Sequence, residues 1–362
     1  MNRLGAGSGR LAVVAMSGGV DSSVAAALVA ERRGSDGVLG ISLRLYSTDE
    51  HATRSGRSCC APDDLYDARR AAAALGIRFY VYDAQERFRT EVIDDFVGAY
   101  ARGETPNPCV RCNQQVKFDW LLDRARRLGA VELVTGHYAR IERGEDGRWR
   151  LLRARDAAKD QSYFLHGLTQ DELAFVRFPL GELTKPQVRE LARRRRLPNA
   201  DKPESMEVCF VAGQPVAEFL ESHGVSPARG EIVDLTGQVV GEHDGIHRFT
   251  VGQRRGLGVP HKLPLYVAAL DADRQRVVVG PREEVARRSF RALQASWVTQ
   301  PPEPGASCEV QIRHRGKPLA ARIEPDGDDV RVTLSEPAVG VAPGQSAVFY
   351  SGDCVLGGAR IA

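Results

Sequence analysis

The first half of the chain alternates between short apolar runs and longer segments with the spacing of amphipathic helices. The apolar runs are Leu11–Ala15, Val38–Tyr46, Ile77–Tyr82 and Val131–Thr135, and the helical segments are Val24–Arg33, Asp63–Leu75, Gln85–Ala101 and Asn113–Leu128. Strands that alternate with helices are typical of a parallel sheet with helices on both faces. We therefore predict an α/β fold with a doubly wound parallel sheet, whose ligands lie at the carboxyl ends of the strands.

The second half has a different pattern. After His223, short alternating runs rich in Gly, Val, Ile and Thr follow one another, separated by turn dipeptides. This pattern is typical of all-β structure. We predict an α/β domain over residues 1–215, with a basic helical part near residues 160–210, and two smaller β-rich domains over residues 216–282 and 283–362.

Composition and charge narrow the class of protein. Hydrophobic residues make up 43% of the 362 residues and charged residues 27%, which is ordinary for a globular protein. No apolar run has the length of a membrane span, and the N-terminus lacks a signal-peptide core, so we expect a cytoplasmic protein with no membrane partner. The stretch from Lys185 to Lys202 contains seven Lys and Arg residues and two acidic residues. Such a stretch suits bound phosphates or a solvated helix face.

The string MSGGVDSS at residues 16–23 joins the first predicted strand to the first predicted helix. A glycine turn at a helix N-terminus can hold an anion, because free backbone N–H groups and the helix dipole both point at it. No Walker A lysine follows the turn. The hydroxyls of Ser17, Ser22 and Ser23 could cradle a pyrophosphate while Asp21 helps to hold Mg²⁺. This interpretation predicts cleavage of ATP between the α- and β-phosphates; the alternative is a plain capped turn.

Seven cysteines in a chain without export signals argue against a disulfide framework. In the string GETPNPCVRCNQQVKF, Pro106 and Pro108 predict an extended approach to Cys109 and Cys112, just ahead of a helix that begins near Asn113. A helix N-terminus stabilises a thiolate. Half of a zinc site is the alternative, but Cys59 and Cys60 lack the required spacing. By itself, Cys209 reads as a buried core thiol, like Cys308 and Cys354.

Six motifs occur in order: SGGVDSS, TPNPCVRCNQQVKF, TGHYAR at Thr135–Arg140, KDQSYFL at Lys159–Leu165, KPES with a following CF, and GQRRGLG at Gly252–Gly258. The set resembles the bacterial tRNA-specific 2-thiouridylase family of PP-loop ATP pyrophosphatases, and it spans nearly the whole chain. The resemblance implies a PP-loop ATP-binding domain, a small β domain and a C-terminal β-barrel that helps to hold tRNA.

The resemblance also implies a reaction: ATP adenylates the 2-carbonyl oxygen of the wobble uridine, a cysteine persulfide delivers sulfur, and 2-thiouridine, AMP and pyrophosphate are formed. The implied partners are tRNA and a sulfur-donor protein, and we expect a monomer. The chemistry is reasonable, since adenylation turns a poor leaving group into a good one and a persulfide is nucleophilic. The base must leave the anticodon loop, where unpaired bases are easily extruded.

Residue roles follow from the matching motifs. Cys209 is expected to carry the persulfide and Cys112 to be its catalytic partner, and the resemblance implies a disulfide between them during turnover. The expected ATP contacts are Ala15, Met16, Ser17, Gly18, Gly19, Val20, Asp21, Ser22, Leu43 and Gly136. Asn107, Pro108 and Cys109 are expected to contact the target base, and His137, Lys159, Asp160, Gln161, Arg313, His314 and Gln345 the tRNA.

Cys109 departs from the pattern of many members, which carry Asp at that position. A thiol transfers a proton less readily at neutral pH, given its higher reference pKa. The extra thiol raises a second hypothesis, in which Cys109, Cys112 and Cys209 hold a [4Fe–4S] cluster. Two other functions stay open: another PP-loop adenylating enzyme, such as an amide ligase, and a non-catalytic tRNA-binding protein.

Overall fold

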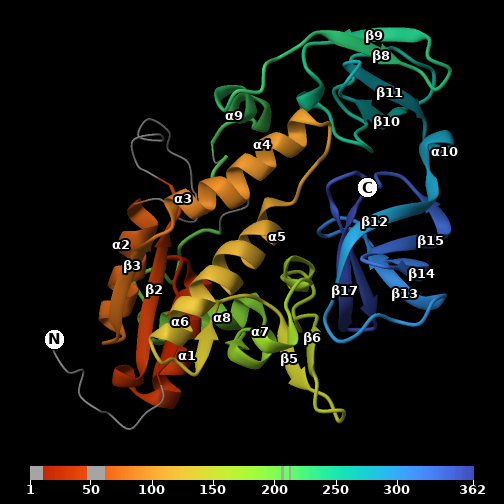
Figure 1. The fold of residues 1–362 in the computed structure, drawn as a ribbon. Helices are drawn as coiled ribbons and strands as arrows, with labels where there is room; N and C mark the ends of the chain where they lie inside the picture. Colours follow the sequence, from red (N-terminus) through yellow and green to blue (C-terminus); the bar gives the residue numbers. More distant parts are fainter. Residues whose placement is uncertain (1–10, 47–61, 205–207, 212) are drawn as a thin grey trace. The chain divides into compact units, whose positions relative to one another are not determined.

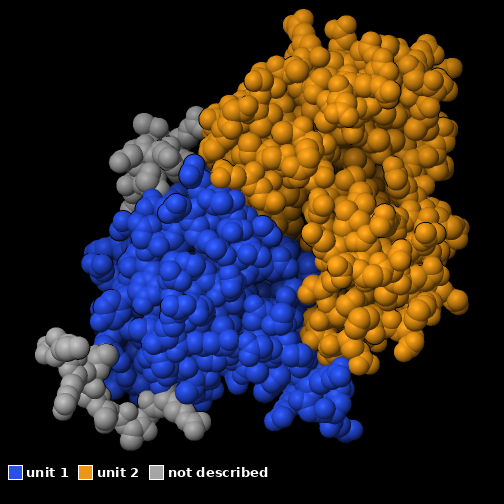
Figure 2. Space-filling view, viewed as in Figure 1, with its two compact units in different colours: residues 1–91, 109–213 blue, residues 92–108, 214–362 orange. Residues whose placement is uncertain are grey.

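The computed structural model describes residues 11–46, 62–204, 208–211 and 213–362 (Figure 1). The chain divides into two compact units. The first contains residues 1–91 and 109–213, and the second contains residues 92–108 and 214–362 (Figure 2). Among the described residues, no helix has both the length and the apolar character that a membrane span needs.

The first unit is built on a five-stranded parallel sheet with the strand order β3-β2-β1-β4-β7. The strands are β1 (Ala12–Ala15), β2 (Val38–Arg44), β3 (Arg78–Asp83), β4 (Glu132–Val134) and β7 (Val176–Arg177). The central strand β1 pairs in parallel with β2 on one side and β4 on the other. The strand order therefore reverses between β1 and β4, and in open parallel sheets ligands commonly bind at the carboxyl ends of the strands beside such a point. The predicted α/β fold with a parallel sheet is confirmed.

Helices pack on this sheet because their apolar stripes match its buried face. Val14 of β1 shares one core with Val24 of α1 (Val20–Arg33), Ala68 of α2 (Pro62–Ala74) and Val188 of α8 (Lys185–Arg194). All four of these side chains are small or β-branched, so the helices can approach the sheet closely. The remaining elements of this unit are α3 (Gln85–Phe88), α6 (Leu122–Arg127), α7 (Gln170–Phe175), and the hairpin of β5 (Arg140–Arg143) and β6 (Trp149–Leu152).

Two predicted helices differ in their details. The segment expected as one helix over Gln85–Ala101 contains a π-helical turn at Arg89–Ile93 before α4 (Asp94–Ala101). The helix expected to begin near Asn113 begins earlier, with α5 (Pro108–Cys112), and continues as a π-helix over Asn113–Leu121. Proline suits the first position of a helix, because its missing N–H would have no intrahelical partner there.

The second unit contains a small mixed sheet with the order β10-β11-β8-β9. Its elements are α9 (Val216–Ser222), β8 (Gly230–Val233), β9 (Val239–His243), β10 (Leu265–Asp271), β11 (Arg276–Pro281) and α10 (Arg282–Val285). Ile232, Val267 and Val277 form part of its core. The domain limits at residues 215 and 282 stay predictions, since this sheet and the strands after it belong to one compact unit.

Six further strands of this unit form a closed antiparallel barrel. They are β12 (Arg287–Trp297), β13 (Ala306–Gln311), β14 (Leu319–Asp326), β15 (Asp329–Ala338), β16 (Ser346–Ser351) and β17 (Cys354–Ile361). The order is β12-β15-β14-β13-β16-β17, and β12 also pairs with β17, which closes the ring. In β15, buried Val330 and Val332 alternate with exposed Arg331, so one face of the strand fills the barrel.

We expect Phe349→Ala to lower the free energy of unfolding of the barrel by about 3–5 kcal/mol, because the cavity it leaves cannot close fully. Phe349 is fully buried and stacks on Trp297 with ring centroids 5.6 Å apart. The measurement is urea denaturation followed by hydrogen exchange of β16 and β17. Leu263→Ala is the control, since Leu263 is 56% exposed and should change the stability by less than about 0.5 kcal/mol. Equal effects of the two changes would contradict the prediction.

Candidate nucleotide and thiol site

The turn between β1 and α1 is organised by its own serines. The carbonyl of Gly19 accepts hydrogen bonds from the hydroxyls of Ser22 and Ser23, both at 3.1 Å. The backbone N–H of Ser17 donates to Ser22 Oγ at 3.1 Å. No side chain caps the N-terminus of α1, which begins at Val20 directly after Gly19. The turn therefore presents a 14-residue helix N-terminus of the kind that holds phosphate.

Two glycines of the site permit close backbone contacts. Gly18 has φ +77°, and a Cβ atom there would lie 2.1 Å from the carbonyl oxygen of Asp64 in α2. Gly136 follows β4, and a Cβ atom there would lie 2.7 Å from the backbone nitrogen of Ser22. Any larger residue would push β4 and α1 apart at the point where the sheet order reverses. The structure thus brings the predicted ATP residue Gly136 against the turn.

Residues from the basic stretch brace this turn. Asn199, which is 4% exposed, donates through Nδ2 to the carbonyl of Gly18 and to Ser23 Oγ, both at 2.9 Å. Lys202 pairs with Asp64 and with Asp67 of α2. The turn at residues 16–19, which is predicted to bind pyrophosphate and is called the pyrophosphate turn below, is therefore held between α2 and the segment that follows α8.

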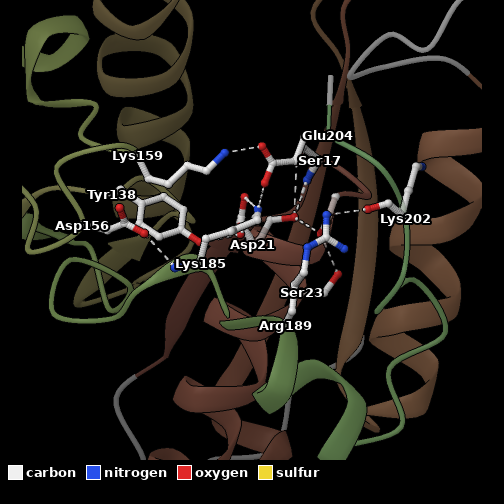
Figure 3. Close-up of polar contacts among 12 residues, drawn as sticks. Ser17, Asp21, Ser23, Tyr138, Asp156, Lys159, Lys185, Arg189, Lys202 and Glu204 are labelled. Atoms are coloured by element: carbon white, nitrogen blue, oxygen red, sulfur yellow. Dashed lines mark hydrogen bonds and ion pairs between the residues drawn. The ribbon is translucent and has the colours of Figure 1, made fainter. Parts of the chain in front are cut away.

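The carboxylate of Asp21 lies in a network of charges (Figure 3). Lys185 Nζ lies 2.8 Å from Asp21 Oδ1 and 2.7 Å from Oδ2, and Tyr138 donates its hydroxyl to Oδ1 at 2.8 Å. Burial, together with the charge and hydrogen bond of Asp21, raises the pKa of Tyr138 far above its usual value, so its hydroxyl keeps its proton. Lys185 is itself 7% exposed and needs these acidic partners.

Glu204 extends the network to a second lysine. Its Oε1 lies 2.7 Å from Lys185 Nζ and its Oε2 lies 2.5 Å from Lys159 Nζ. Partial burial by itself would raise the pKa of Glu204, but the hydrogen bonds from Lys159 and Lys185 and their charges outweigh it and lower the pKa to about 2. Glu204 therefore stays ionised at neutral pH. Two ammonium groups and two carboxylates alternate in space in this network.

A small cavity of about 70 Å³ connects the turn to one of the cysteines. Its lining includes the predicted ATP residues Ala15, Met16, Ser17 and Leu43, the predicted catalytic Cys112, and Asp64 and Lys117. The hydroxyl of Ser42 donates to the carbonyl of Met16 and holds the end of β1 against β2. Residues of the β1–α1 turn, of β2 and of α5, the helix that contains Cys112, thus line the same cavity.

The two thiols of α5 differ in position and exposure. Cys109 is the second residue of the helix and is exposed, whereas Cys112 is its last residue and is 8% exposed. The expectation that both lie ahead of the helix was wrong, because the helix begins at Pro108. Thiolate stabilisation by the helix dipole therefore applies to Cys109 and is weaker for Cys112, since the effect falls off within the first turn.

Cys209 is half-buried and precedes Phe210, whose ring packs edge-on against Phe88 at 5.7 Å. The pairing of Cys112 with Cys209 stays a prediction, as do the other residue roles. Cys59, Cys60 and the Ser205 of the KPES string lie outside the described residues.

The residues expected to contact tRNA include several with internal partners. His137 Nδ1 lies 2.7 Å from Thr135 Oγ1, and burial together with the charge of Lys117 keeps the pKa of His137 well below its usual value. Asp160 accepts hydrogen bonds from the N–H groups of Ala154 and Ser162, at 2.9 and 3.2 Å. Gln161 Oε1 accepts from the N–H of Tyr138 at 2.9 Å. These hydrogen bonds hold the backbone near Tyr138, whose hydroxyl contacts Asp21. A neutral His137 and a hydrogen-bonded Gln161 therefore help to fix the position of this segment.

In the second unit, Gln345 connects two segments that lie far apart in the sequence. Its Nε2 donates to the carbonyls of Thr105 and Pro106, at 2.8 and 3.3 Å. The N–H of Thr105 donates to the carbonyl of Pro343 at 2.7 Å. These bonds fasten the segment that leads to Asn107 and Pro108. Arg313 is exposed and His314 is half-buried at the end of β13.

Three family models match the chain. A tRNA methyl transferase HUP domain matches residues 10–213, a tRNA methyl transferase PRC-barrel domain matches residues 217–281, and an aminomethyltransferase β-barrel domain matches residues 287–361. The tRNA-specific 2-thiouridylase of Geobacter metallireducens is 51% identical over 96% of this chain and 96% of its own length. That of Chloroflexus aurantiacus is 49% identical over 97% of this chain and 98% of its own length.

This chain belongs to the tRNA-specific 2-thiouridylase family. The resemblance inferred from six motifs is thereby confirmed. A solved NMN synthetase from Francisella tularensis covers 54% of this chain and 67% of its own, with 18% identity and a TM-score of 0.33, which is too distant to inform the site.

The donor set fits the phosphates of a nucleotide. The uncapped start of α1, the hydroxyls of the turn and the ammonium of Lys185 supply donors, and Asp21 supplies an oxygen ligand suited to Mg²⁺. Among the residues that the structure describes, no three His, Cys, Asp or Glu side chains are grouped to hold a metal ion, and the [4Fe–4S] cluster stays a hypothesis.

Sequence reasoning missed Lys185, Asn199, Lys202 and Glu204 as parts of the site. The signal was present in part, because the basic stretch was bounded by Lys185 and Lys202 and Glu204 stands in the KPES string. The sequence does not show which residues become neighbours of these side chains in the folded chain. In the structure, both lysines turn toward carboxylates of the pyrophosphate turn or of α2, and not toward solvent.

We expect Gly18→Ala to destabilise the first unit by about 2 kcal/mol or more, because the left-handed backbone is strained for alanine and the new methyl overlaps Asp64. Urea denaturation measures the effect. Gly19→Ala is the matched control: its φ is −81°, and a Cβ atom there would lie 3.6 Å from Ser17 Oγ. A loss in Gly19→Ala as large as that in Gly18→Ala would contradict the role of the close approach.

The lowered pKa of Glu204 predicts an acid-sensitive part of the stability. Above pH 4.5 the carboxylate is ionised in the folded and unfolded chains, and its ion pairs stabilise the fold. As pH falls through 4.5 toward 2, the unfolded chain takes up the proton first and this stabilisation is lost. The stability difference between wild type and Glu204→Gln, at most about 1 kcal/mol for so exposed a group, should therefore shrink between pH 6 and pH 3. Urea denaturation measures this stability difference, and a value that stays constant from pH 6 to pH 3 would contradict the prediction.

Proposed function

We propose that this protein is a tRNA-uridine 2-sulfurtransferase that uses ATP to adenylate the 2-carbonyl oxygen of the wobble uridine and then replaces that oxygen with persulfide sulfur. The observation that supports this best is the cavity that places Cys112 beside Ala15, Met16 and Ser17 of the pyrophosphate turn. A nucleotide held by that turn would then lie next to the thiol of Cys112. Membership of the family supports the same reaction.

ATP is bound through the turn and the strand ends. Backbone N–H groups at the start of α1, the hydroxyls of Ser17 and Ser22, and Lys185 hold the β- and γ-phosphates, which depart as pyrophosphate. When Mg²⁺ is bound with the nucleotide, the carboxylate of Asp21 would be an oxygen ligand for it. Leu43 and Gly136, at the ends of β2 and β4, contact the adenosine. The α-phosphate then faces the cavity, where the uracil oxygen attacks it.

Sulfur transfer follows on the adenylated base. Cys209 carries the persulfide; its terminal sulfur attacks C2 of the uracil, the C2–O bond breaks, and AMP leaves with that oxygen. Cys112 then attacks Cys209 Sγ, which forms a disulfide between the two cysteines and releases the 2-thiouridine. The thiol of Cys112 must be a thiolate to do so. A thiol reductant restores both cysteines for the next cycle.

The tRNA supplies an unpaired base. Extruding a loop base costs little compared with one in a duplex, and proteins that recognise RNA by sequence mostly target such loops. Asn107, Pro108 and the exposed Cys109 contact the extruded uracil, and the hydrogen bonds of Gln345 hold the backbone ahead of them. A donor protein that carries a persulfide loads Cys209. His137, Lys159, Arg313 and His314 contact the tRNA outside the target base.

Two rival functions make different predictions. An amide ligase of the PP-loop type requires no pair of reactive thiols, so it would keep its activity in Cys112→Ser and Cys209→Ser. A non-catalytic tRNA-binding protein would bind tRNA with a steep salt dependence and release no AMP. The shared cavity of Cys112 and the pyrophosphate turn favours the sulfurtransferase over both.

We expect Cys112→Ser and Cys209→Ser to abolish 2-thiouridine formation, because each removes a sulfur atom that is needed for transfer or release. The assay combines protein, ATP, Mg²⁺, a persulfide donor and tRNA, and nucleosides are analysed after digestion. Cys354→Ser in β17 is the control and should keep wild-type activity. Full activity of either Cys112→Ser or Cys209→Ser would overturn the proposed thiol chemistry.

A further inference from the structure

Lys117 lines the cavity beside the pyrophosphate turn, and the reaction proposed above gives it no role. Ser17 of the turn and Cys112 of α5 line the same cavity. The cavity has a volume of about 70 Å³, whereas pockets that enclose a whole small ligand measure roughly 300–1,000 Å³. Only part of a nucleotide can therefore enter it. In the proposed reaction, the part that faces this cavity is the α-phosphate.

A π-helix brings Lys117 to this cavity together with Cys112. Lys117 follows Cys112 by five residues and lies in the π-helix Asn113–Leu121. Residues of an α-helix turn by about 100° each, so the fifth residue after Cys112 would lie about 140° around the axis. In a π-helix, hydrogen bonds join residues five apart, and such residues stack one turn apart. The thiol residue and the lysine can therefore line one cavity, and both do.

The other charge at this cavity is already balanced. Among the described residues that line it, seven are apolar, two are serines and one is Cys112, so the charged members are Asp64 and Lys117. Asp64 is 6% exposed and is paired with Lys202. An anion that enters such surroundings is costly unless a cation meets it. Lys117 supplies that cation.

Two neighbouring groups are poor substitutes for Lys117. Burial and, to a smaller degree, the charge of Lys117 keep the pKa of His137 well below its usual value, so His137 is neutral and brings no charge to a phosphate. Lys185 is already in contact with the carboxylates of Asp21 and Glu204, and it is assigned above to the β- and γ-phosphates. The α-phosphate therefore depends on Lys117 for its positive charge.

We propose that Lys117 is a further catalytic residue, whose ammonium group binds the α-phosphate at the cavity and stabilises the charge that develops on AMP as it leaves. This inference rests on the proposed function, because it requires an adenylated base. When the C2–O bond of the adenylated uracil breaks, its electron pair stays on the oxygen that leaves with AMP. The phosphate thereby gains a second negative charge. A preorganised positive charge beside it lowers the barrier to this step.

The test compares wild type with Lys117→Met and Lys117→Gln, which remove the charge, and with Lys117→Arg, which keeps it. Arg127→Gln is the matched control, because Arg127 ends α6, the helix that follows the π-helix, and its side chain is 77% exposed and paired with Asp123. Circular dichroism establishes that each variant is folded. Two neutral variants are used so that poor folding of one leaves the other to decide.

Calorimetry with three probes separates the parts of the nucleotide. AMP carries the α-phosphate, adenosine carries no phosphate, and inorganic pyrophosphate with Mg²⁺ represents the β- and γ-phosphates. We expect the neutral variants to bind AMP roughly five- to tenfold more weakly than wild type, because one charge-assisted contact is lost. Their affinities for adenosine and pyrophosphate should stay within about twofold of the wild-type values.

The 2-thiouridine assay measures the effect on the reaction. We expect Lys117→Met and Lys117→Gln to lower kcat on the order of a hundredfold and to change the KM for ATP far less, because the charge on AMP is larger in the transition state than in bound ATP. Lys117→Arg should recover a large part of kcat. Arg127→Gln should match wild type in kcat and in AMP affinity.

Three results would overturn the inference. They are wild-type affinity for AMP in the neutral variants, an equal loss of affinity for all three probes, and an unchanged kcat. The second is what a merely structural role of Lys117 predicts. Failure of the proposed function looks different: wild type then makes no 2-thiouridine, or Cys112→Ser stays fully active, whatever the Lys117 variants bind.

Discussion

The ammonium group of Lys185 is the interaction on which the described site depends. Lys185 is 7% exposed, and a buried ammonium is costly unless acidic partners surround it. Its contacts with Asp21 and Glu204 join three segments of the chain: the start of α1, the start of α8 and the segment after residue 199. The backbone N–H of Lys185 also donates to Asp156 at 2.9 Å, which holds the start of α8. Together with the hydrogen bonds of Asn199 to Gly18 and Ser23, this ion-pair network holds the turn and the segment after α8 to each other.

The sheet order explains why the site forms where it does. Because β2 and β4 pair on opposite sides of β1, the turns that follow β1 and β4 meet at one edge of the sheet. Gly18 and Gly136 allow these turns to approach α2 and α1 more closely than any side chain would permit. The cavity beside these turns is lined by Leu43, Leu45 and Cys112 together with Met16 and Ser17.

Much of the site was predictable from residue type and local order. The strand–turn–helix reading of MSGGVDSS holds, since β1 ends at Ala15 and α1 begins at Val20. The thiol segment was recognised, but the start of its helix was placed too late, because the capacity of Pro108 to begin a helix was overlooked. Gln345 was expected only as a tRNA contact, and the sequence did not predict that its amide holds the backbone at Thr105, more than 200 residues away in the sequence. Local patterns carry no information about a partner at such a distance.

The sequence by itself determined the alternation of strands and helices, the change to β structure after His223, the glycine turn and the family, because these depend on periodicity, glycine placement and short motifs. Only the tertiary structure decided which charges face one another. In the sequence, Lys185, Asn199 and Lys202 look like ordinary members of a basic stretch, and Glu204 looks like a polar residue beyond it. Their contacts follow from the packing of α8 against α1 and of the segment after it against α2. Electrostatic partners are set by distance in space, and that distance exists only once the chain has folded.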